Sequence, residues 1–427
     1  MTVCIVPKRF TGTVKIPASK SHTIRQLLIA SLADGESVIE YPLDSLDTQS
    51  CLLACRAFGA EIEEQRNGDE IVSWKVRGNG GFKNSCACVS SAPIDIGNSG
   101  TTLYLALAAA GLHSKPVSFT GDEQIQKRSA SQLLEALTGL GIKCTSYNGC
   151  APITIQGPWK GGRVNLPCPT SQYLSALLIA SPLAPAGTVT EINVPLLNEK
   201  PYIDMTLSYL KAHDIPFEAK PDYSYFKIPG GSYWKPFSRA VPGDFSSAAF
   251  PAAAAAISGG KVTMSGLDPN DTQGDRYFLK MLAEMGCDVH LPSMTVSRDG
   301  PLRGGTFDLN ETPDLLPAAA VVAAYADGDT ALVNVAHARI KETDRIAVMA
   351  KELAKLGVCC TELPDGLIIH GKGGIFPKGQ PVIDGYGDHR IVMAFAAAAL
   401  GSSVPIEITT AECAAVTYPG FLDLITK

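Results

Sequence analysis

The sequence repeats one pattern six times, and this repeat limits the folds that the chain can adopt. Each copy opens with a short polar cluster, and successive clusters lie about 70 to 78 residues apart. The clusters are Ser19-Lys20-Ser21, Gly97-Asn98-Ser99-Gly100-Thr101, Thr170-Ser171-Gln172, Gly243-Asp244-Phe245-Ser246-Ser247, Thr312-Pro313-Asp314 and Gly387-Asp388-His389-Arg390. This interval is longer than the repeat of a solenoid and suits a small folding unit instead.

Within each copy, the hydrophobic pattern predicts a helix, a strand, a second helix and a second strand. An Ala/Leu-rich helix follows the polar cluster and ends in a Gly-containing turn, as at Asp34-Gly35. A strand with alternating hydrophobicity comes next, for example at 37–40. An amphipathic helix then closes on Leu-x-x-x-Gly, as at Leu353 to Gly357, and a strand such as 288–290 follows it. The pattern therefore predicts an α/β (α+β) protein.

Six units of this kind suggest two domains of three units each. The Pro-, Gly- and Tyr-rich stretch 221–236 separates the third unit from the fourth, so one crossing is expected near 238–243. The strand at 3–6 precedes the first unit and is expected to pair in the far domain, which places a second crossing near 18–20. The predicted domains are residues 19–240, and residues 1–18 plus 241–427.

Composition excludes several classes of protein. The chain has 427 residues, of which 45% are hydrophobic and 18% charged, so it can build a large core and is not disordered. The net charge of −6 argues against a nucleic-acid partner, which requires a surplus of Lys and Arg. The longest apolar stretch, 250–257, is too short to cross a bilayer, and no apolar leader segment follows Lys8 and Arg9. The 12 Cys lack the spacing of a metal site, so we expect reduced thiols in the cytoplasm and no metal.

Cationic side chains near the polar clusters carry the functional argument. Helix N-termini attract anions, so a cation at a helix start is unfavourable unless an anion binds there. Lys341 and Arg345 are four residues apart, which predicts that they lie on one helical face, and they flank Glu342. Asp314 heads an almost uncharged helix, where it serves as a cap or, in a shared cleft, as a general base. The cations concerned are Lys20, Arg25, Arg128, Lys341, Arg345 and Arg390.

Over essentially its whole length, the sequence resembles the enolpyruvyl transferases of the EPSP synthase (3-phosphoshikimate 1-carboxyvinyltransferase) family. The matching segments are 17–21, 97–101, 121–122 with Arg128, 171–174, 200–204, 243–247, 272–275, 313–314, 341–345 and 388–390. The resemblance implies two domains, each of three βαβαββ units with buried parallel helices. It also implies transfer of the carboxyvinyl group of phosphoenolpyruvate (PEP) to the 5-hydroxyl of shikimate 3-phosphate, with release of phosphate, in the cleft between the domains.

The resemblance further assigns a role to each site residue and implies a monomer without a metal or an organic cofactor. The residues implied for PEP are Lys20, Gly100, Arg128, Gln172, Arg345 and Arg390. Those implied for shikimate 3-phosphate are Lys20, Ser21, Arg25, Thr170, Ser171, Gln172, Asp314 and Lys341. Catalysis falls to Asp314, which would take the proton of the attacking hydroxyl, and to Glu342 with Lys20, which would act at the PEP methylene.

The sequence departs from the family pattern at several positions. Tyr104 stands where the family has Arg, and Val416 stands where it has a Lys that would contact PEP. Glu199 replaces a Ser that would bind the shikimate phosphate, and a carboxylate facing a phosphate is repulsive. Ser129 stands where Pro is common. These departures leave two alternatives open: an unphosphorylated shikimate-like or cyclitol acceptor, and a lyase that eliminates water from such a ring.

Overall fold

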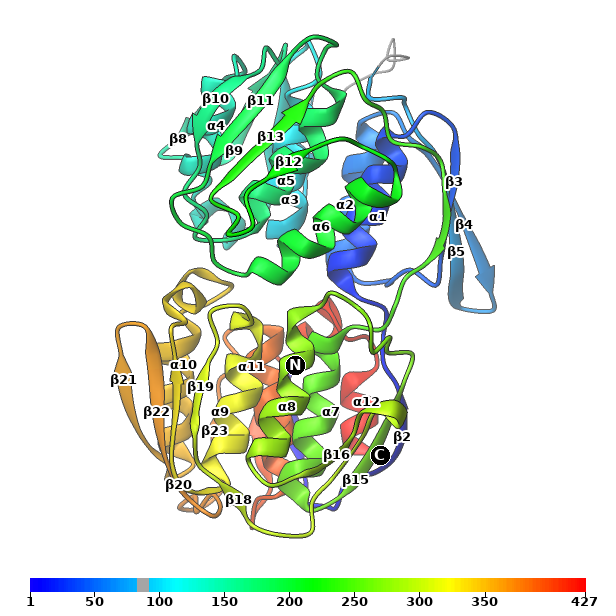
Figure 1. The fold of residues 1–427 in the computed structure, drawn as a ribbon. Helices are drawn as coiled ribbons and strands as arrows, with labels where there is room; N and C mark the ends of the chain where they lie inside the picture. Colours follow the sequence, from blue (N-terminus) through cyan, green and yellow to red (C-terminus); the bar gives the residue numbers. More distant parts are fainter. Residues whose placement is uncertain (83–91) are drawn as a thin grey trace. The chain divides into compact units, whose positions relative to one another are not determined.

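The computed structural model describes residues 1–82 and 92–427, and the chain forms two compact units (Figure 1). The N-terminal unit comprises Lys20–Val241. The C-terminal unit combines Met1–Ser19 with Pro242–Lys427. Each unit has its own helices, sheets and core, and the two are described separately below.

Apolar helices form the centre of the N-terminal unit. They are α1 (Lys20–Leu32), α3 (Gly100–Ala110) and α5 (Gln172–Ala180). Almost every side chain of these helices is buried, as the hydrophobicity of α3 and α5 on all sides predicts, whereas α1 also buries polar residues such as His22, Arg25 and Gln26. The remaining α-helices bury only one face and alternate with the first set along the chain: α2 (Leu46–Ala57), α4 (Ser131–Gly139) and α6 (Lys200–Ala212).

In the described part of the N-terminal unit, one strand arrangement occurs three times. Each sheet has one parallel pair of strands followed by two antiparallel pairings. The first sheet has the order β14 (Ser238–Ala240), β3 (Glu36–Glu40), β5 (Glu70–Arg77), β4 (Glu61–Asn67). The second has the order β6 (Ile94–Asp95), β7 (Val117–Thr120), β9 (Cys150–Gln156), β8 (Lys143–Tyr147). The third has the order β10 (Gly162–Asn165), β11 (Val189–Asn193), β13 (Tyr225–Pro229), β12 (Glu218–Ala219).

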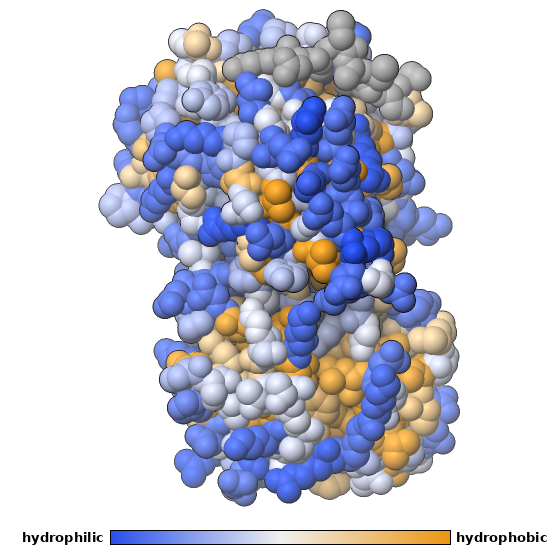
Figure 2. Space-filling view, turned by 90° about the vertical axis from the view of Figure 1, so that its right-hand side faces the viewer, coloured by the Kyte–Doolittle hydropathy of each residue, from blue (hydrophilic) through white to orange (hydrophobic). Residues whose placement is uncertain are grey.

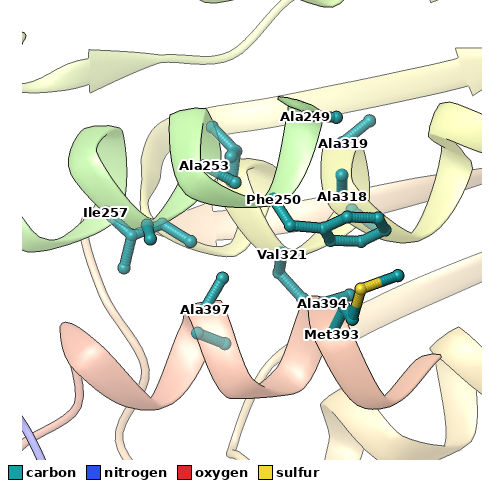
Figure 3. Packing of buried hydrophobic residues seen from close by; sticks show 14 of the residues in the cluster. Ala249, Phe250, Ala253, Ile257, Ala318, Ala319, Val321, Met393, Ala394 and Ala397 are labelled. Atoms are coloured by element: carbon teal, nitrogen blue, oxygen red, sulfur yellow. The ribbon is translucent and has the colours of Figure 1, made fainter. Parts of the chain in front are cut away.

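The C-terminal unit repeats the helical scheme with α7 (Phe245–Ser258), α9 (Leu316–Ala324) and α11 (His389–Leu400) at its centre. These three helices pack directly on one another. Small side chains such as Ala253 and Ala397 allow this close packing, and Phe250 fills the space beside them (Figure 3). The amphipathic partners are α8 (Tyr277–Glu284), α10 (Arg345–Lys355) and the short α12 (Phe421–Thr426).

The N-terminal residues of the chain belong to the sheets of the C-terminal unit. There β2 (Thr11–Lys15) runs parallel to β15 (Lys261–Ser265), and β1 (Val3–Ile5) runs antiparallel to β24 (Ile406–Ile408). The sheet that contains β2 and β15 continues through β17 (Thr295–Ser297) to β16 (Asp288–His290). In a second sheet, β24 lies between β1 and β23 (Val382–Ile383). The third sheet contains β18 (Leu302–Arg303), β19 (Thr306–Asp308), β20 (Ala326–Val333), β22 (Gly366–Lys372) and β21 (Cys359–Leu363).

Hydrophilic side chains predominate on the face drawn in Figure 2, and hydrophobic side chains appear there in patches. The large exposed hydrophobic residues come from distant parts of the sequence, for example Leu46, Tyr147, Ile340 and Phe376. None of the helices in residues 1–82 and 92–427 has the length and hydrophobicity needed to cross a membrane.

Candidate active site

Arg345 is the centre of a charged cluster in the C-terminal unit. It is the first residue of α10, and its side chain is fully buried. Its guanidinium donates to Asp314 Oδ1 at 2.8 Å, to Glu342 Oε2 at 2.5 Å and to both carboxylate oxygens of Asp388 at 2.8 and 3.1 Å. Burial alone lowers the pKa of Arg345, but these carboxylates outweigh burial and raise it. A cation held at a helix start by three carboxylates is the arrangement that the sequence could not explain by capping.

Asp314 links Arg345 to the second arginine of the cluster. It lies in the 3-10 helix η5 (Pro313–Leu315), directly before α9. Its Oδ2 accepts from Arg390 Nη2 at 3.0 Å while its Oδ1 accepts from Arg345. Burial raises the pKa of Asp314, but Arg390, Lys341 and Arg345 together hold it well below its usual range. The carboxyl is therefore ionised.

Lys341 and Glu342 do not lie on the helix that contains Arg345. They follow the 3-10 helix η6 (Ala336–Ile340), and α10 begins only at Arg345. The expectation of one helical face for Lys341 and Arg345 is therefore wrong. The reason is Asp344, whose side chain accepts from Ala347 N and caps α10, so that the preceding residues form a turn. This turn nevertheless brings Glu342 onto Arg345.

Asp388 is a member of the cluster that our set of predicted site residues missed. It is fully buried and precedes α11, where its Oδ1 accepts from Arg390 N at 2.9 Å. Its Oδ2 also accepts from Thr343 Oγ1 at 3.0 Å. Burial raises the pKa of Asp388, but Arg345 overcomes this and lowers it. The Asp388-His389-Arg390 segment marked this position in the sequence, but we assigned only Arg390 to the site and overlooked Asp388.

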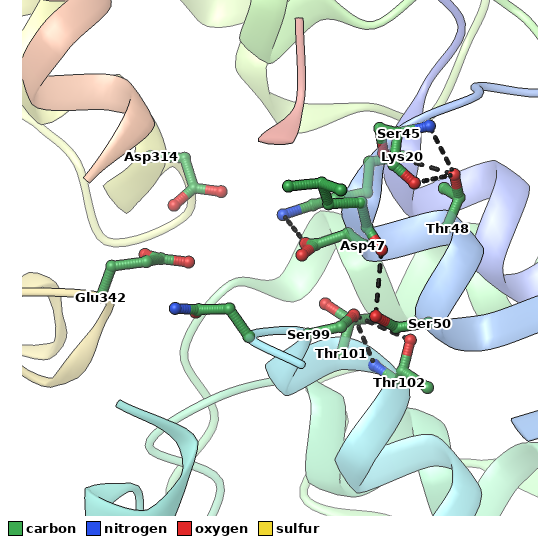
Figure 4. A network of polar contacts seen from close by, with 12 residues as sticks. Lys20, Ser45, Asp47, Thr48, Ser50, Ser99, Thr101, Thr102, Asp314 and Glu342 are labelled. Atoms are coloured by element: carbon green, nitrogen blue, oxygen red, sulfur yellow. Dashed lines mark hydrogen bonds and ion pairs between the residues drawn. The ribbon is translucent and has the colours of Figure 1, made fainter. Parts of the chain in front are cut away.

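In the N-terminal unit, Lys20 occupies the first position of α1 and forms an ion pair with Asp47 at 3.0 Å. Figure 4 shows this pair together with Ser99 and Thr101, which lie at the start of α3. Both charged side chains are largely buried, with 14% and 7% of their surface exposed. Asp47 was not predicted, because an acidic residue in the first turn of a helix resembles an ordinary helix-stabilising charge.

Gly100, Arg128 and Gln172 lie close together. A Cβ added to Gly100 would lie 2.7 Å from Arg128 Nη1, so the guanidinium lies directly against the backbone at the start of α3. Gln172, the first residue of α5, donates to Thr101 Oγ1 at 3.1 Å. We expected Arg128 at the start of a helix, and this expectation is wrong. Its backbone is extended, and it lies between the 3-10 helix η1 (Ile125–Lys127) and α4.

Arg25 is buried among polar groups of α5 and α6. Its guanidinium donates to Thr206 Oγ1 at 3.0 Å, to Ser175 Oγ at 3.1 Å and to the carbonyl oxygen of Ser21 at 3.1 Å. Burial lowers the pKa of Arg25 to about 10, while Tyr209, Tyr202 and Glu199 act in the opposite direction. Arg25 is 1% exposed, and its hydrogen bonds link α1 to α5 and α6.

Thr170 and Ser171 direct their donors at Glu199. The Oε2 of Glu199 accepts from Ser171 Oγ at 2.8 Å, Ser171 N at 3.0 Å and Thr170 Oγ1 at 3.1 Å. Glu199 is 2% exposed. The segment before Ser171 and the segment before Glu199 are hydrogen-bonded to each other, which brings the two residues together. Cys168 N donates to Leu196 O at 2.8 Å, and Asn198 N donates to Cys168 O at 3.2 Å.

The other departures from the expected pattern have simpler surroundings. Tyr104 is buried on α3, and its ring lies edge-on to the ring of Tyr173 with centroids 5.0 Å apart. Burial, with Tyr104 nearby, raises the pKa of Tyr173. Ser129 Oγ contacts Ser131 Oγ at 2.8 Å. Val416 is half-buried at the end of the 3-10 helix η7 (Ala411–Val416), which packs on α11.

Comparison with known proteins shows which family the chain belongs to. The model of the family described as EPSP synthase (3-phosphoshikimate 1-carboxyvinyltransferase) matches residues 6–425. The chain belongs to the EPSP synthase family. A curated 3-phosphoshikimate 1-carboxyvinyltransferase of Acetivibrio thermocellus is 44% identical over 100% of this chain and 98% of its own length. One of Methanothermobacter thermautotrophicus is 40% identical, over 96% and 94% respectively.

A solved structure also matches this member of the EPSP synthase family. The EPSP synthase of Acinetobacter baumannii superimposes with a TM-score of 0.79 at 28% identity, covering 99% of this chain and 97% of that one. The predicted family, the mixed α/β class and the two-domain enolpyruvyl transferase fold are confirmed. Nothing in these comparisons favours an unphosphorylated acceptor or a lyase. Within the described residues, no group of three or more His, Cys, Asp or Glu side chains is arranged to hold a metal ion.

Proposed function

We propose that this chain transfers the carboxyvinyl group of PEP to the 5-hydroxyl of shikimate 3-phosphate and releases phosphate. The observation that carries the proposal is the convergence of Arg345 and Arg390 on the single carboxylate of Asp314. Two guanidinium groups aimed at one carboxylate form a site that also suits the carboxylate of PEP. The same site holds a carboxylate of its own that can act as a base.

Binding of PEP would divide between the arginine pair and the start of α3. Arg345 and Arg390 would bind the PEP carboxylate in place of Asp314. The PEP phosphate would be held by Arg128, Gln172, Lys20 and the backbone at Gly100. Support comes from the contact of the Arg128 guanidinium with Gly100 and from the side chain of Gln172, which reaches Thr101. Backbone N–H groups at the first turn of a helix add further donors for an anion.

Shikimate 3-phosphate would bind to the groups around α5. Thr170 and Ser171 would donate to its phosphate, with Lys20 and Gln172 adding donors. Ser21, Arg25 and Lys341 would contact the acceptor's anionic groups and hydroxyls. Arg25 is buried, and its hydrogen-bond partners Thr206 and Ser175 are neutral, so its positive charge would favour an anion bound nearby.

The reaction then needs two proton transfers, and the carboxylates of the cluster would perform them. Asp314 would take the proton of the attacking hydroxyl as its oxygen bonds to the central carbon of PEP. Glu342, with Lys20, would deliver a proton to the methylene carbon, which becomes a methyl group. Removal of a proton from that methyl group and departure of phosphate would restore the double bond. Asp314 starts with a low pKa, so loss of its arginine partners to PEP would raise its basicity at the required step.

We also infer a cytoplasmic monomer. All groups assigned to the reaction come from one chain, so a second copy is not needed to complete the set. The described cysteines are all free thiols, and several are buried, as expected in a reducing compartment. Gel filtration with light scattering tests the monomer directly.

The decisive experiment measures phosphate release with PEP and a panel of acceptors. We expect turnover of shikimate 3-phosphate, and loss of turnover in Asp314→Asn, which keeps the shape of the side chain but removes its basicity. The matched control is Asp329→Asn, because Asp329 is 66% exposed on β20 and pairs with His370. Phosphate release that is equally fast in Asp314→Asn, or absent in the wild type with shikimate 3-phosphate, would contradict the proposal.

A further inference from the structure

One oxygen of Glu199 receives three hydrogen bonds, which is the coordination of a bound anion. Two donors come from Ser171, through its backbone N–H and its hydroxyl, and one comes from the Thr170 hydroxyl. These donors precede the first turn of the nine-residue helix α5, where the partial positive charge of the helix favours negative groups. A buried carboxylate therefore occupies a site with the chemistry of an anion-binding site.

The backbone of Glu199 is shaped to place this carboxylate there. Glu199 has φ 59° and ψ 44°, the left-handed conformation that L-residues with long side chains rarely adopt. It directly precedes α6, yet its side chain makes no capping bond to that helix. The carboxylate turns instead to the neighbouring loop, where Asn198 Nδ2 also donates to Pro169 O at 3.2 Å. An unfavourable backbone conformation held by a specific contact favours a role beyond capping.

We propose that Glu199 is a resident anion that occupies the acceptor-phosphate site of the free enzyme, and that shikimate 3-phosphate must displace its carboxylate in order to bind. The inference depends on the proposed function, since it assigns Thr170 and Ser171 to the phosphate of the acceptor. Two anions cannot share donors that already converge on one oxygen, because their repulsion in a buried site is strong. Binding of the acceptor is then an exchange of one anion for another.

This exchange sets the affinity for the acceptor. If the carboxylate occupies the site for about 90–99% of the time, the apparent affinity for the phosphate is about 10- to 100-fold weaker than in an open site. Once displaced, Glu199 no longer acts on the bound complex, so its effect falls on KM and Kd rather than on the chemical step. Shikimate, which lacks the phosphate, does not compete with Glu199 in this way.

The test compares Glu199→Gln and Glu199→Ser with the wild type by isothermal titration and by steady-state kinetics. Gln keeps the size of the side chain but removes the charge, and Ser also vacates the space. We expect Kd and KM for shikimate 3-phosphate to fall about 10-fold in Glu199→Gln and about 100-fold in Glu199→Ser, with little change in the Kd for shikimate. The matched control is Glu218→Gln, which removes one carboxylate from the same unit at a site that is 69% exposed.

The outcomes distinguish this inference from the proposed function. Unchanged or raised Kd for shikimate 3-phosphate in both variants, in an enzyme whose wild type turns this acceptor over, overturns the role of Glu199 alone. Equal turnover of shikimate and its 3-phosphate by the wild type also overturns it, because Glu199 would then replace the phosphate permanently. No turnover of either acceptor by the wild type contradicts the proposed function. Thermal unfolding of both variants reveals a purely structural role: a lower Tm with an unchanged Kd overturns the inference.

Discussion

Replacing Gly100 by Ala tests whether Arg128 must lie against the start of α3. The added Cβ would lie 2.7 Å from Arg128 Nη1 and 3.8 Å from both Arg128 Cζ and the Tyr104 ring. Contacts under 3.0 Å are essentially never seen for a Cβ, whereas 3.4 Å is ordinary van der Waals contact. The methyl group therefore forces one atom of the guanidinium to move, and the rest of the surroundings accommodates it.

The size of the effect follows from this distance. The guanidinium must retreat by about 0.7 Å to reach ordinary contact, which stretches a hydrogen bond to a PEP phosphate oxygen beyond its useful range. A hydrogen bond to a charged group is worth about 1.5–3 kcal/mol, so KM for PEP should rise about 10- to 150-fold. Stability should change little, because Ala is the better helix former by about 1 kcal/mol and the displaced atoms end a flexible side chain.

Steady-state phosphate release at saturating shikimate 3-phosphate measures this change, and thermal unfolding measures stability. The control is Gly300→Ala, because a Cβ at Gly300 meets no atom within 4 Å. An unchanged KM for PEP in Gly100→Ala would refute the assignment of Arg128. A large fall in Tm would refute the reasoning in another way, by showing that the guanidinium cannot give way.

Three further changes probe the C-terminal unit. Burial, with Asp314 nearby, raises the pKa of Asp275 to about 7. The unfolded chain therefore loses this proton before the folded protein does, and the free energy of unfolding falls as pH rises from about 4 to 7, by at most about 1.4 kcal/mol per pH unit. Asp275→Asn should therefore gain in urea midpoint over the wild type at pH 8 but not at pH 4, with exposed Asp288→Asn as the control. Asp388→Asn should cost about 3–5 kcal/mol in urea unfolding, because buried Arg345 loses a charge partner that is itself fully buried. An unchanged midpoint would contradict this. Val416→Lys adds a cation on the 3-10 helix that packs on α11, so KM for PEP should fall, and an unchanged KM counts against a role for this position.

The helical framework and the location of the polar clusters could be predicted because both follow from local pattern. Helices such as α3, α7 and α9 are apolar on all sides, which marks them as buried, and the polar residues can then only lie at their starts. The pairing of β1 with β24 could also be predicted, because the strand at 3–6 precedes the first repeat, whereas β2 and its pairing with β15 were not predicted. Local pattern failed at Lys341, where one capping side chain, Asp344, decides that a turn precedes the helix.

The buried acids were harder to predict than the cations. Asp47 and Asp388 each lie at or near a helix start, where Asp is common for reasons of capping alone. Only the fold shows that each carboxylate contacts a cation that is distant in sequence, Lys20 for Asp47 and Arg345 for Asp388. Glu199 could be recognised as unusual, but the loop pairing that presents it to Ser171 links segments about thirty residues apart and has no local signal.

Taken together, these acids explain how an acidic protein keeps cations ready for anionic substrates. Several groups assigned to a substrate anion contact a carboxylate of the protein itself: Lys20 contacts Asp47, Arg345 and Arg390 contact Asp314, and Ser171 contacts Glu199. A buried cation without such a partner would be costly in the free protein. On the proposed assignments, binding therefore exchanges one carboxylate or phosphate for another, and little net charge is buried. The exchange would also have a chemical consequence at Asp314, because PEP that takes over its two arginines would remove two of the three cations that lower its pKa. In the proposed reaction, Asp314 would therefore become a stronger base when PEP is bound, which would couple proton removal from the acceptor to the presence of the second substrate.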